Sequence, residues 1–169
     1  MRHIAGKVGV TPMAIYRHYP SKQALIDALV LDALAEWSAR VAAIPAVAPL
    51  EWLAKIGEAH LDFALNEPRR YEAAFLLHSG KARRYPDDFV AGHSPSGALQ
   101  LKLISELMDQ GVLQAASSIE IMIVMAGLAQ GLITLYRAGR IAGGEAAFRD
   151  LYRRATRRCL EGFFTEKTA

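Results

Sequence analysis

Proline, glycine and helix-capping residues divide this sequence into segments, and in most of them apolar residues recur at intervals of three and four. That period is typical of amphipathic α-helices. Thr11 stands before Pro12 and Ser21 follows Pro20, so a helix is expected to begin after each of these two N-cap residues. No segment has a convincing strand pattern, and no internal repeat is visible. The sequence therefore predicts an all-α protein.

The expected helices differ in length. Short ones are predicted over residues 2–8, ending at Gly9, and from Thr11 to Tyr19, before Pro20. A long helix over residues 21–44 follows, with these residues on one face: Ile26, Leu29, Val30, Ala33, Trp37, Val41 and Ile44. The remaining predictions are helices over residues 50–65, 68–78, 98–110, 117–137 and 145–164, a loop from Gly80 to Ser96, and a capping box formed by Ser117 and Glu120.

Composition places the chain among globular proteins. With 169 residues, of which 52% are apolar, it can bury a core. The single cysteine, Cys159, forms no internal disulfide, and no cysteine or histidine pattern has metal-ligand spacing, so a cytoplasmic protein without a metal or other cofactor is expected. The uncharged run Ile121–Tyr136 is 16 residues long, shorter than the roughly 20 that span a bilayer, and is interpreted as a buried helix rather than a membrane segment.

The two short N-terminal helices have the layout of a helix-turn-helix, in which the second helix enters the major groove of DNA. Gly9 can adopt the positive φ that a tight turn between them requires. The charge distribution agrees, because every charged residue from Met1 to Lys22 is basic and the first carboxylate is Asp27. The helix start expected at Ser21 adds free N–H groups that can bind a phosphate. Thr11 to Tyr19 is therefore the predicted recognition segment.

At this point the sequence resembles a known family. The run Ile4–Leu25, which reads IAGKVGVTPMAIYRHYPSKQAL, is similar to the DNA-binding signature of the tetracycline-repressor family. In that signature an Ile-Ala-x-x-x-Gly-Val helix and turn precede an aromatic-x-His-aromatic helix, then Ser-Lys and an aliphatic helix. The succession of helices in the rest of the chain is also compatible with the family's ligand-binding domain.

The resemblance implies a role for each matching position. Family members tend to contact bases at the positions of Thr11, Pro12, Met13 and Arg17, and phosphates at those of Tyr16, His18 and Lys22. The chain would then be a ligand-responsive regulator of transcription, most simply a repressor that an unknown small molecule releases from a palindromic operator in double-stranded DNA. Residues 1–24 would form the DNA-binding domain and residues 25–169 the ligand-binding and dimerisation domain, joined by the helix over 21–44.

The family's architecture also implies a homodimer. Its last two helices pair in a four-helix interface, here residues 117–137 and 145–164, and Gly127 and Gly131 would let the helices approach closely. The sequence departs from the family at its start, because the helix that normally precedes the two short ones is missing. We therefore expect a truncated chain or a misassigned start codon, and an incomplete helix-turn-helix with exposed apolar side chains at Ile4, Val8, Val10 and Ile15.

Candidate effector-binding residues lie on the apolar faces of the middle helices: His60, Phe63, Phe75, His78, Met108, Met122 and Met125. Pockets in helical proteins are mostly apolar with a few polar groups, so the two histidines are the expected polar contacts. Two alternatives stay open for these residues. They could belong to the core, or the histidines could form a zinc site with Asp62 or Glu58.

Two other function classes compete with a regulator. An enzyme is not expected, because the sequence has no G-x-S-x-G, P-loop, HExxH or dinucleotide-binding motif. The second alternative is a helical dimerisation partner whose helix-turn-helix no longer binds DNA. A gel-shift assay separates it from the regulator, because only the regulator binds DNA in a salt-sensitive and sequence-specific way.

Overall fold

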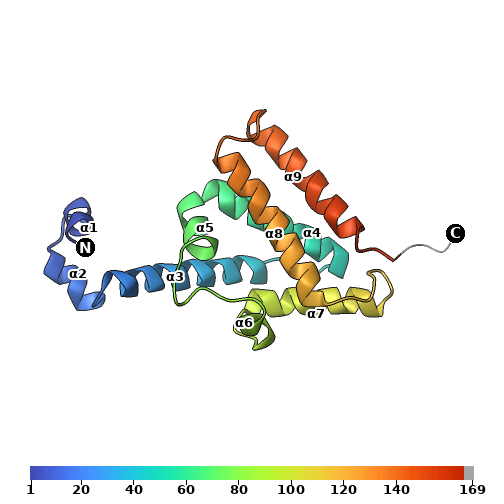
Figure 1. Ribbon diagram of the computed structural model, residues 1–169, viewed down its shortest axis with the longest axis horizontal. Helices are drawn as coiled ribbons and strands as arrows, with labels where there is room; N and C mark the ends of the chain where they lie inside the picture. The colour runs from blue at the N-terminus through green and yellow to red at the C-terminus, as the bar shows by residue number, and fades with distance from the viewer. Residues whose placement is uncertain (166–169) are drawn as a thin grey trace.

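The computed structural model of the chain describes residues 1–165, which form helices joined by short connections (Figure 1). The helices are α1 (Arg2–Val8), α2 (Pro12–His18), α3 (Lys22–Ala42), α4 (Pro49–Asn66), α5 (Pro68–Phe75), α6 (Asp87–Val90), α7 (Pro95–Asp109), α8 (Ser118–Arg137) and α9 (Gly144–Glu161). Extended backbone pairs at one place within the described residues, an isolated antiparallel bridge between Leu113 and Phe164. The all-α prediction is confirmed.

α1 and α2 stand apart from the other helices, at the N-terminal end of α3 (Figure 1). From there α3 runs into the body of the protein, where it packs against α5, α7 and α4. The helix boundaries predicted at this end are confirmed, because Thr11 and Ser21 are the N-cap residues of α2 and α3. Gly9 ends α1 in the left-handed conformation, with a φ of 72°, which residues with a side chain rarely adopt.

The face that α3 buries differs from the predicted one. Val30, Ala33, Trp37 and Val41 are buried as expected, and Leu34 is buried with them. Leu29 is 48% exposed and lines a surface hollow between α3 and α5 instead. The buried stripe follows the contact with α5, which the apolar pattern of α3 alone cannot locate.

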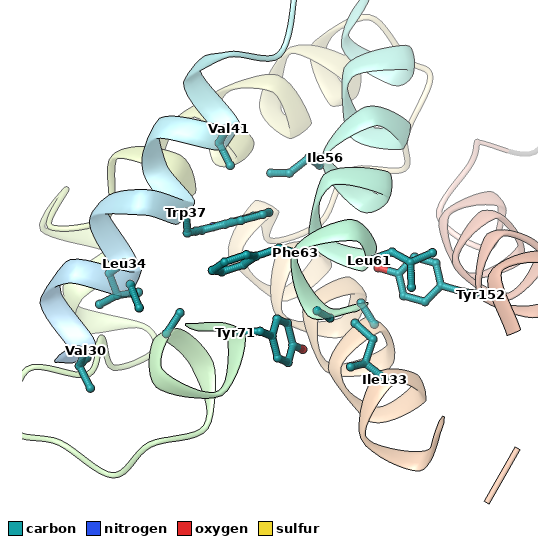
Figure 2. Close-up of a cluster of buried hydrophobic side chains, with 14 of the residues drawn as sticks. Val30, Leu34, Trp37, Val41, Ile56, Leu61, Phe63, Tyr71, Ile133 and Tyr152 are labelled. Carbon is teal, nitrogen blue, oxygen red and sulfur yellow. The ribbon is translucent and has the colours of Figure 1, made fainter. Parts of the chain in front are cut away.

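Two apolar cores hold the helices together. In the larger one, side chains of α3 face those of α4 and α5, and side chains of α8 and α9 close the far side (Figure 2). Its labelled members are Val30, Leu34, Trp37, Val41, Ile56, Leu61, Phe63, Tyr71, Ile133 and Tyr152. The smaller core joins α7, α8 and the segment between them through Ile104, Leu107, Leu113, Ile121 and Met122. Burying one large apolar side chain stabilises the fold by roughly 1.5–3 kcal/mol, so these cores fix the arrangement of the helices.

Five local predictions are wrong in detail, and one of them is the end of the last helix, because α9 ends at Glu161 rather than at Phe164. α5 ends at Phe75 rather than at His78, and the loop predicted from Gly80 to Ser96 contains the one-turn helix α6. α7 begins at Pro95, three residues early, because the Ser94 hydroxyl caps it by accepting a hydrogen bond from the Gly97 N–H at 3.2 Å. α8 begins after Ser117 as expected, but the Ser117 side chain makes no capping hydrogen bond.

α8 is buried on one face only, whereas the uncharged run within it is predicted to be a buried helix. Its inward residues Ile121, Met122 and Ile133 are buried. The outward residues are exposed: Ile123, Val124, Gly127, Gly131, Thr134 and Leu135. By length and composition α8 could cross a membrane, although core helices of other proteins pass the same test, and 22% of its most apolar stretch is buried.

Candidate functional site

The turn between α1 and α2 is held by backbone hydrogen bonds to one carbonyl. The N–H groups of Gly9 and Val10 both donate to the carbonyl oxygen of Ala5, Val10 at 3.1 Å, and Ala5 is fully buried beneath the turn. The Thr11 hydroxyl accepts a hydrogen bond from the Ala14 N–H at 3.2 Å and so caps α2. This is the local geometry of a helix-turn-helix, with a small residue at the crossing of the two helices.

The predicted DNA-binding residues lie on α2, at its N-cap and at the start of α3, at one end of the molecule (Figure 1). Thr11 is the N-cap of α2, Pro12 its half-buried first residue, and Met13 is 67% exposed. The other four are also exposed: Tyr16, Arg17 and His18 on α2, and Lys22 at the start of α3. α2 has no buried residue, so its outer face is free to meet a partner. The contacts of these residues with DNA stay predictions.

A positive surface surrounds α2. The Ser21 hydroxyl accepts a hydrogen bond from the Ala24 N–H at 3.0 Å, which begins α3 with its positive end beside Lys22. The nearest carboxylate in the sequence, Asp27, accepts hydrogen bonds from Ser79 at 2.6 Å and Gln23 at 2.8 Å. These bonds, that from Ser79 above all, lower the pKa of Asp27 and hold its negative charge against the α5–α6 connection. The surface of α2 therefore favours an anionic partner.

Apolar side chains of α1 and of the turn are left uncovered, as predicted for an incomplete helix-turn-helix. Val8 is 63% exposed, Val10 45% and Ile4 38%, while Ile15 is half-buried. Ile4 and Val8 lie on α1, Val10 lies in the turn, and Ile15 lies on α2 itself.

Three of the predicted effector-binding residues belong to one aromatic cluster in the larger core. His60 and Phe63 of α4 and Phe75 of α5 pack with Trp37 of α3 and Tyr71 of α5, and neighbouring rings have centroids 5.1–6.3 Å apart. Most pairs meet edge to face, the arrangement that aromatic quadrupoles favour. We call these five residues the aromatic cluster; Figure 2 shows Trp37, Phe63 and Tyr71.

The other four predicted effector residues lie elsewhere. Met108, Met122 and Met125 belong to or pack on the smaller core. His78 is exposed, beyond the end of α5. Tyr71 is not among the residues predicted from the sequence, although its spacing of four residues from Phe75 on α5 is a signal that could have indicated it.

The partners of a zinc site are not assembled. His60 is buried, whereas His78 is exposed. Asp62 and Glu58 form ion pairs with Arg149 at 2.7 Å and Arg153 at 2.8 Å. Within residues 1–165, no group of three or more His, Cys, Asp or Glu side chains could hold a metal ion.

Polar atoms inside the larger core are incompletely satisfied. The Tyr71 side chain is fully buried, and its hydroxyl has no hydrogen-bond partner among the described residues. The Tyr152 hydroxyl donates to the Gly57 carbonyl at 3.2 Å and lies 3.5 Å from His60 Nδ1, a long contact. An unpaired buried hydroxyl costs about 1–3 kcal/mol, so the Tyr71 hydroxyl marks a place where a partner would stabilise the protein.

Burial keeps these groups neutral. It lowers the pKa of His60 to about 4 and raises the pKa values of Tyr71 and Tyr152 above their usual range. At neutral pH the imidazole and both phenols are therefore uncharged.

A network of charged side chains connects the aromatic cluster to α3. The guanidinium of Arg40 lies over the Phe63 ring, 4.8 Å from its centroid, and binds Glu36 at 2.6 Å. Arg40 also pairs with Glu67, between α4 and α5, and Arg70 of α5 pairs with Glu36. The hydrogen bond from Arg40 lowers the pKa of Glu36. Movement of α5 or of Phe63 would therefore act on α3, which carries α2 at its other end.

Two surface hollows lie along α3. One, of about 360 Å³, has Leu29, Ala33, Ala73 and Leu77 on its apolar side and Asp32, Arg69, Arg70 and Glu72 on its charged side. The other, of about 340 Å³, is lined by Tyr19, Leu25, Ala28, Leu29 and Asp32. None of the predicted effector residues lines either hollow, and Trp37, His60, Phe63 and Tyr71 of the aromatic cluster are buried.

Comparison with known proteins gives matches to both parts of the chain. Residues 53–159 match a family model described as "Tetracyclin repressor-like, C-terminal domain", and residues 1–29 give a partial match to "Bacterial regulatory proteins, tetR family". No curated protein matches. A solved structure described as "Structure of a protein with unknown function from Rhodococcus sp. RHA1" is similar over 97% of this chain and 84% of its own, with a TM-score of 0.73 and 22% identity. At that identity the likeness concerns the fold alone.

Proposed function

The chain belongs to the tetracycline-repressor family and is a DNA-binding transcriptional regulator, and we propose that it is a repressor released from a palindromic operator by a small molecule. The observation that carries the proposal is the exposed helix α2, capped by Thr11 and backed by basic residues without a nearby free carboxylate. We assign residues 1–24 to DNA binding and residues 25–169 to effector binding and dimerisation. Residues 166–169 of the second unit lie outside the described part of the chain.

In this proposal α2 enters the major groove. Thr11, Pro12, Met13 and Arg17 contact bases, because they stand at the leading end of α2 or project from its outer face. Tyr16, His18 and Lys22 contact phosphates, supported by the N-terminus of α3. Phosphate contacts strengthen binding to every sequence, whereas base contacts select among sequences.

A homodimer would present two such helices to one operator. The outward face of α8 supports this part of the proposal, because Ile123, Val124 and Leu135 are 38–47% exposed and flank Gly127 and Gly131. A side-chain carbon built on either glycine would meet nothing within 4 Å, so a second helix can approach closely there. α9, which packs beside α8, would complete a four-helix interface of residues 117–137 and 145–164. Two α2 helices about 34–36 Å apart would match half-sites one turn of DNA apart.

The effector would act by separating or rotating the two α2 helices. We assign its site to the aromatic cluster, with His60, Phe63 and Phe75 as predicted contacts, because the charged network of Arg40 joins this cluster to α3. His78, Met108, Met122 and Met125 stay candidates for a larger opened site. α3 is 21 residues long and carries α2 at its N-terminal end, so it acts as a long lever. A small tilt of α3 would therefore displace α2 enough to disturb the match to the half-sites.

A gel-shift assay with the DNA upstream of the protein's own gene tests the proposal. The expected result is a shifted complex whose affinity falls steeply with added salt and exceeds that for unrelated DNA. Absence of a complex, with the dimer intact, would instead support the alternative of a dimerisation partner that does not bind DNA.

Matched variants separate the two kinds of contact. Lys22→Ala and Tyr16→Phe should weaken binding to all sequences. Lys22→Ala should also reduce the slope of the logarithm of the affinity against the logarithm of the salt concentration by about one. Substitutions at Met13 and Arg17 should change which sequence is preferred. Equal losses on every sequence for both pairs of variants would contradict the assignment.

A further inference from the structure

The aromatic cluster encloses one hydroxyl that nothing in the described residues binds. Tyr71 is fully buried, and Figure 2 shows its hydroxyl directed away from Trp37 and toward Ile133 of α8. The His60 ring lies beside it, with ring centroids 5.2 Å apart. The hydroxyl of Tyr152, 3.5 Å from His60 Nδ1, already donates its proton to the Gly57 carbonyl. The proton of Tyr71 is therefore the free donor at this place.

The surroundings of this donor fix what could accept its proton. Rings of Trp37, Phe63 and Phe75 supply flat apolar faces and edges on one side, and Ile133 supplies an aliphatic contact on the other. Flat, apolar surroundings with a single polar group are complementary to a planar ligand that carries one hydrogen-bond acceptor.

The charges near the cluster disfavour an ionised ligand. Two cations lie near it: Arg40, over the Phe63 ring, is already bound to Glu36 and Glu67, and Arg137, whose charge acts on the Tyr71 hydroxyl, is paired with Glu72 at 3.4 Å. The network of Arg40, Arg70, Glu36, Glu67 and Asp32 holds two positive and three negative groups, a net charge of −1. His60 is neutral at physiological pH. An anion would thus lack a free cation, and a cation would have to leave water for a closed apolar core.

The end of α5 is the least buried part of the cluster. Phe75, the last residue of this eight-residue helix, is half-buried, and Leu76 after it is 46% exposed. Short helices followed by irregular segments open more easily than the core around them. Outward movement of Phe75 would admit a ligand and at the same time act on Arg70 and Glu67 at the other end of α5.

We propose that the effector of this regulator is a neutral planar molecule, aromatic or conjugated, whose carbonyl or ring-nitrogen acceptor receives a hydrogen bond from the Tyr71 hydroxyl. The proposal rests on the proposed function, since it defines the ligand class of the effector site. It adds Tyr71 as the residue that determines specificity and the end of α5 as the entrance.

Three probes of one shape test the ligand class: acetylnaphthalene, which is neutral and has a carbonyl acceptor, ethylnaphthalene, which has no acceptor, and naphthoate, which is ionised. Binding is measured by calorimetric titration of the full chain. Acetylnaphthalene should have the highest affinity. The affinity of ethylnaphthalene should be about tenfold lower, which corresponds to about 1.4 kcal/mol, and that of naphthoate should be the lowest.

Two tyrosine variants identify the donor. Tyr71→Phe should remove the tenfold preference for acetylnaphthalene and leave ethylnaphthalene binding unchanged. Tyr136→Phe is the matched control, because Tyr136 is half-buried and stacks on Phe148 outside the aromatic cluster. Tyr71→Phe should also raise the unfolding midpoint rather than lower it, because the buried hydroxyl that it removes has no partner in the unliganded protein.

Several outcomes would overturn the inference. Naphthoate binding as tightly as acetylnaphthalene would exclude a neutral effector, and a preference that survives Tyr71→Phe would exclude Tyr71 as the donor. Failure of all three probes to bind would exclude a site for such ligands in this cluster. The gel-shift assay of the unliganded chain is independent of these results, so DNA binding without probe binding would refute the ligand class alone.

Discussion

Loss of the Thr11 cap should open the helix-turn-helix without unfolding the rest of the protein. α1 and α2 stand apart from the larger core, Ala5 is the one buried residue of α1, and α2 has none. Local hydrogen bonds therefore contribute a large share of the stability of this unit. The bond from the Ala14 N–H to the Thr11 hydroxyl, at 3.2 Å, is one of them, and Thr11→Ala removes it.

The size of the effect follows from measured helix caps. Replacing an N-cap threonine by alanine costs about 1 kcal/mol, within a range of roughly 0.5–2 kcal/mol. A loss of about 1 kcal/mol raises the equilibrium constant for opening by about fivefold. Because the core residues of α3 to α9 are untouched, the midpoint of global unfolding should stay unchanged.

Amide hydrogen exchange measures this opening residue by residue. Amides of α2 should exchange about fivefold faster in Thr11→Ala, whereas those of α4 should keep their rates. Thr11→Ser retains the hydroxyl and should restore the slow exchange. Ser117→Ala is the matched control at another N-cap, because the Ser117 side chain makes no capping hydrogen bond and its loss should leave α8 unchanged.

Unchanged exchange in α2 would refute the idea that the Thr11 hydroxyl holds this helix. A fall of several degrees in the midpoint of global unfolding would instead refute the assumption that α1 and α2 open independently of the cores. Faster exchange in α8 of Ser117→Ala would contradict the reading of that helix start.

Three further predictions concern the larger core. Phe63→Ala should lower the free energy of unfolding in urea by about 3–5 kcal/mol, because Phe63 is fully buried among the aromatic cluster, whereas Val90→Ala, at a residue 76% exposed, should change it by less than about 0.5 kcal/mol. Tyr152→Phe should cost about 1 kcal/mol, because it removes the hydrogen bond to the Gly57 carbonyl; no change in urea would mean that this bond is not formed in solution. Stability should fall as the pH is lowered from 6.5 toward 4, because the unfolded state binds a proton at His60 in that window and the folded state, with a pKa of about 4, does not. The expected loss between pH 7 and pH 5 is about 2 kcal/mol, and His60→Gln should show a correspondingly smaller loss; equal pH profiles would contradict the burial of a neutral His60.

Much of the fold could be predicted from local signals. Thr11, Ser21 and Gly9 mark helix ends through chemistry that acts over three or four residues, so their structural roles are visible in the sequence. Local signals fail where a contact comes from a distant element. Leu34 is buried and Leu29 exposed because of the position of α5.

The candidate site was less predictable for the same reason. The aromatic cluster joins Trp37, His60 and Phe75 from three helices, and no local pattern pairs residues at such separations. Apolar faces were identified correctly, but the sequence could not tell which faces meet, so the methionines Met108, Met122 and Met125 were grouped with residues of another core. Tyr71 was missed because an unpaired hydroxyl is a property of the packed core and not of a motif.

Selection of binding sites from a random pool of DNA duplexes tests the central claim most directly. A dimer that reads DNA through α2 should enrich a palindrome with half-sites one helical turn, or about 10 base pairs, apart, and substitution of Met13 or Arg17 should change the enriched bases while Lys22→Ala should not. Enrichment of no sequence by a folded dimer, or of the same palindrome by every variant, would contradict the account.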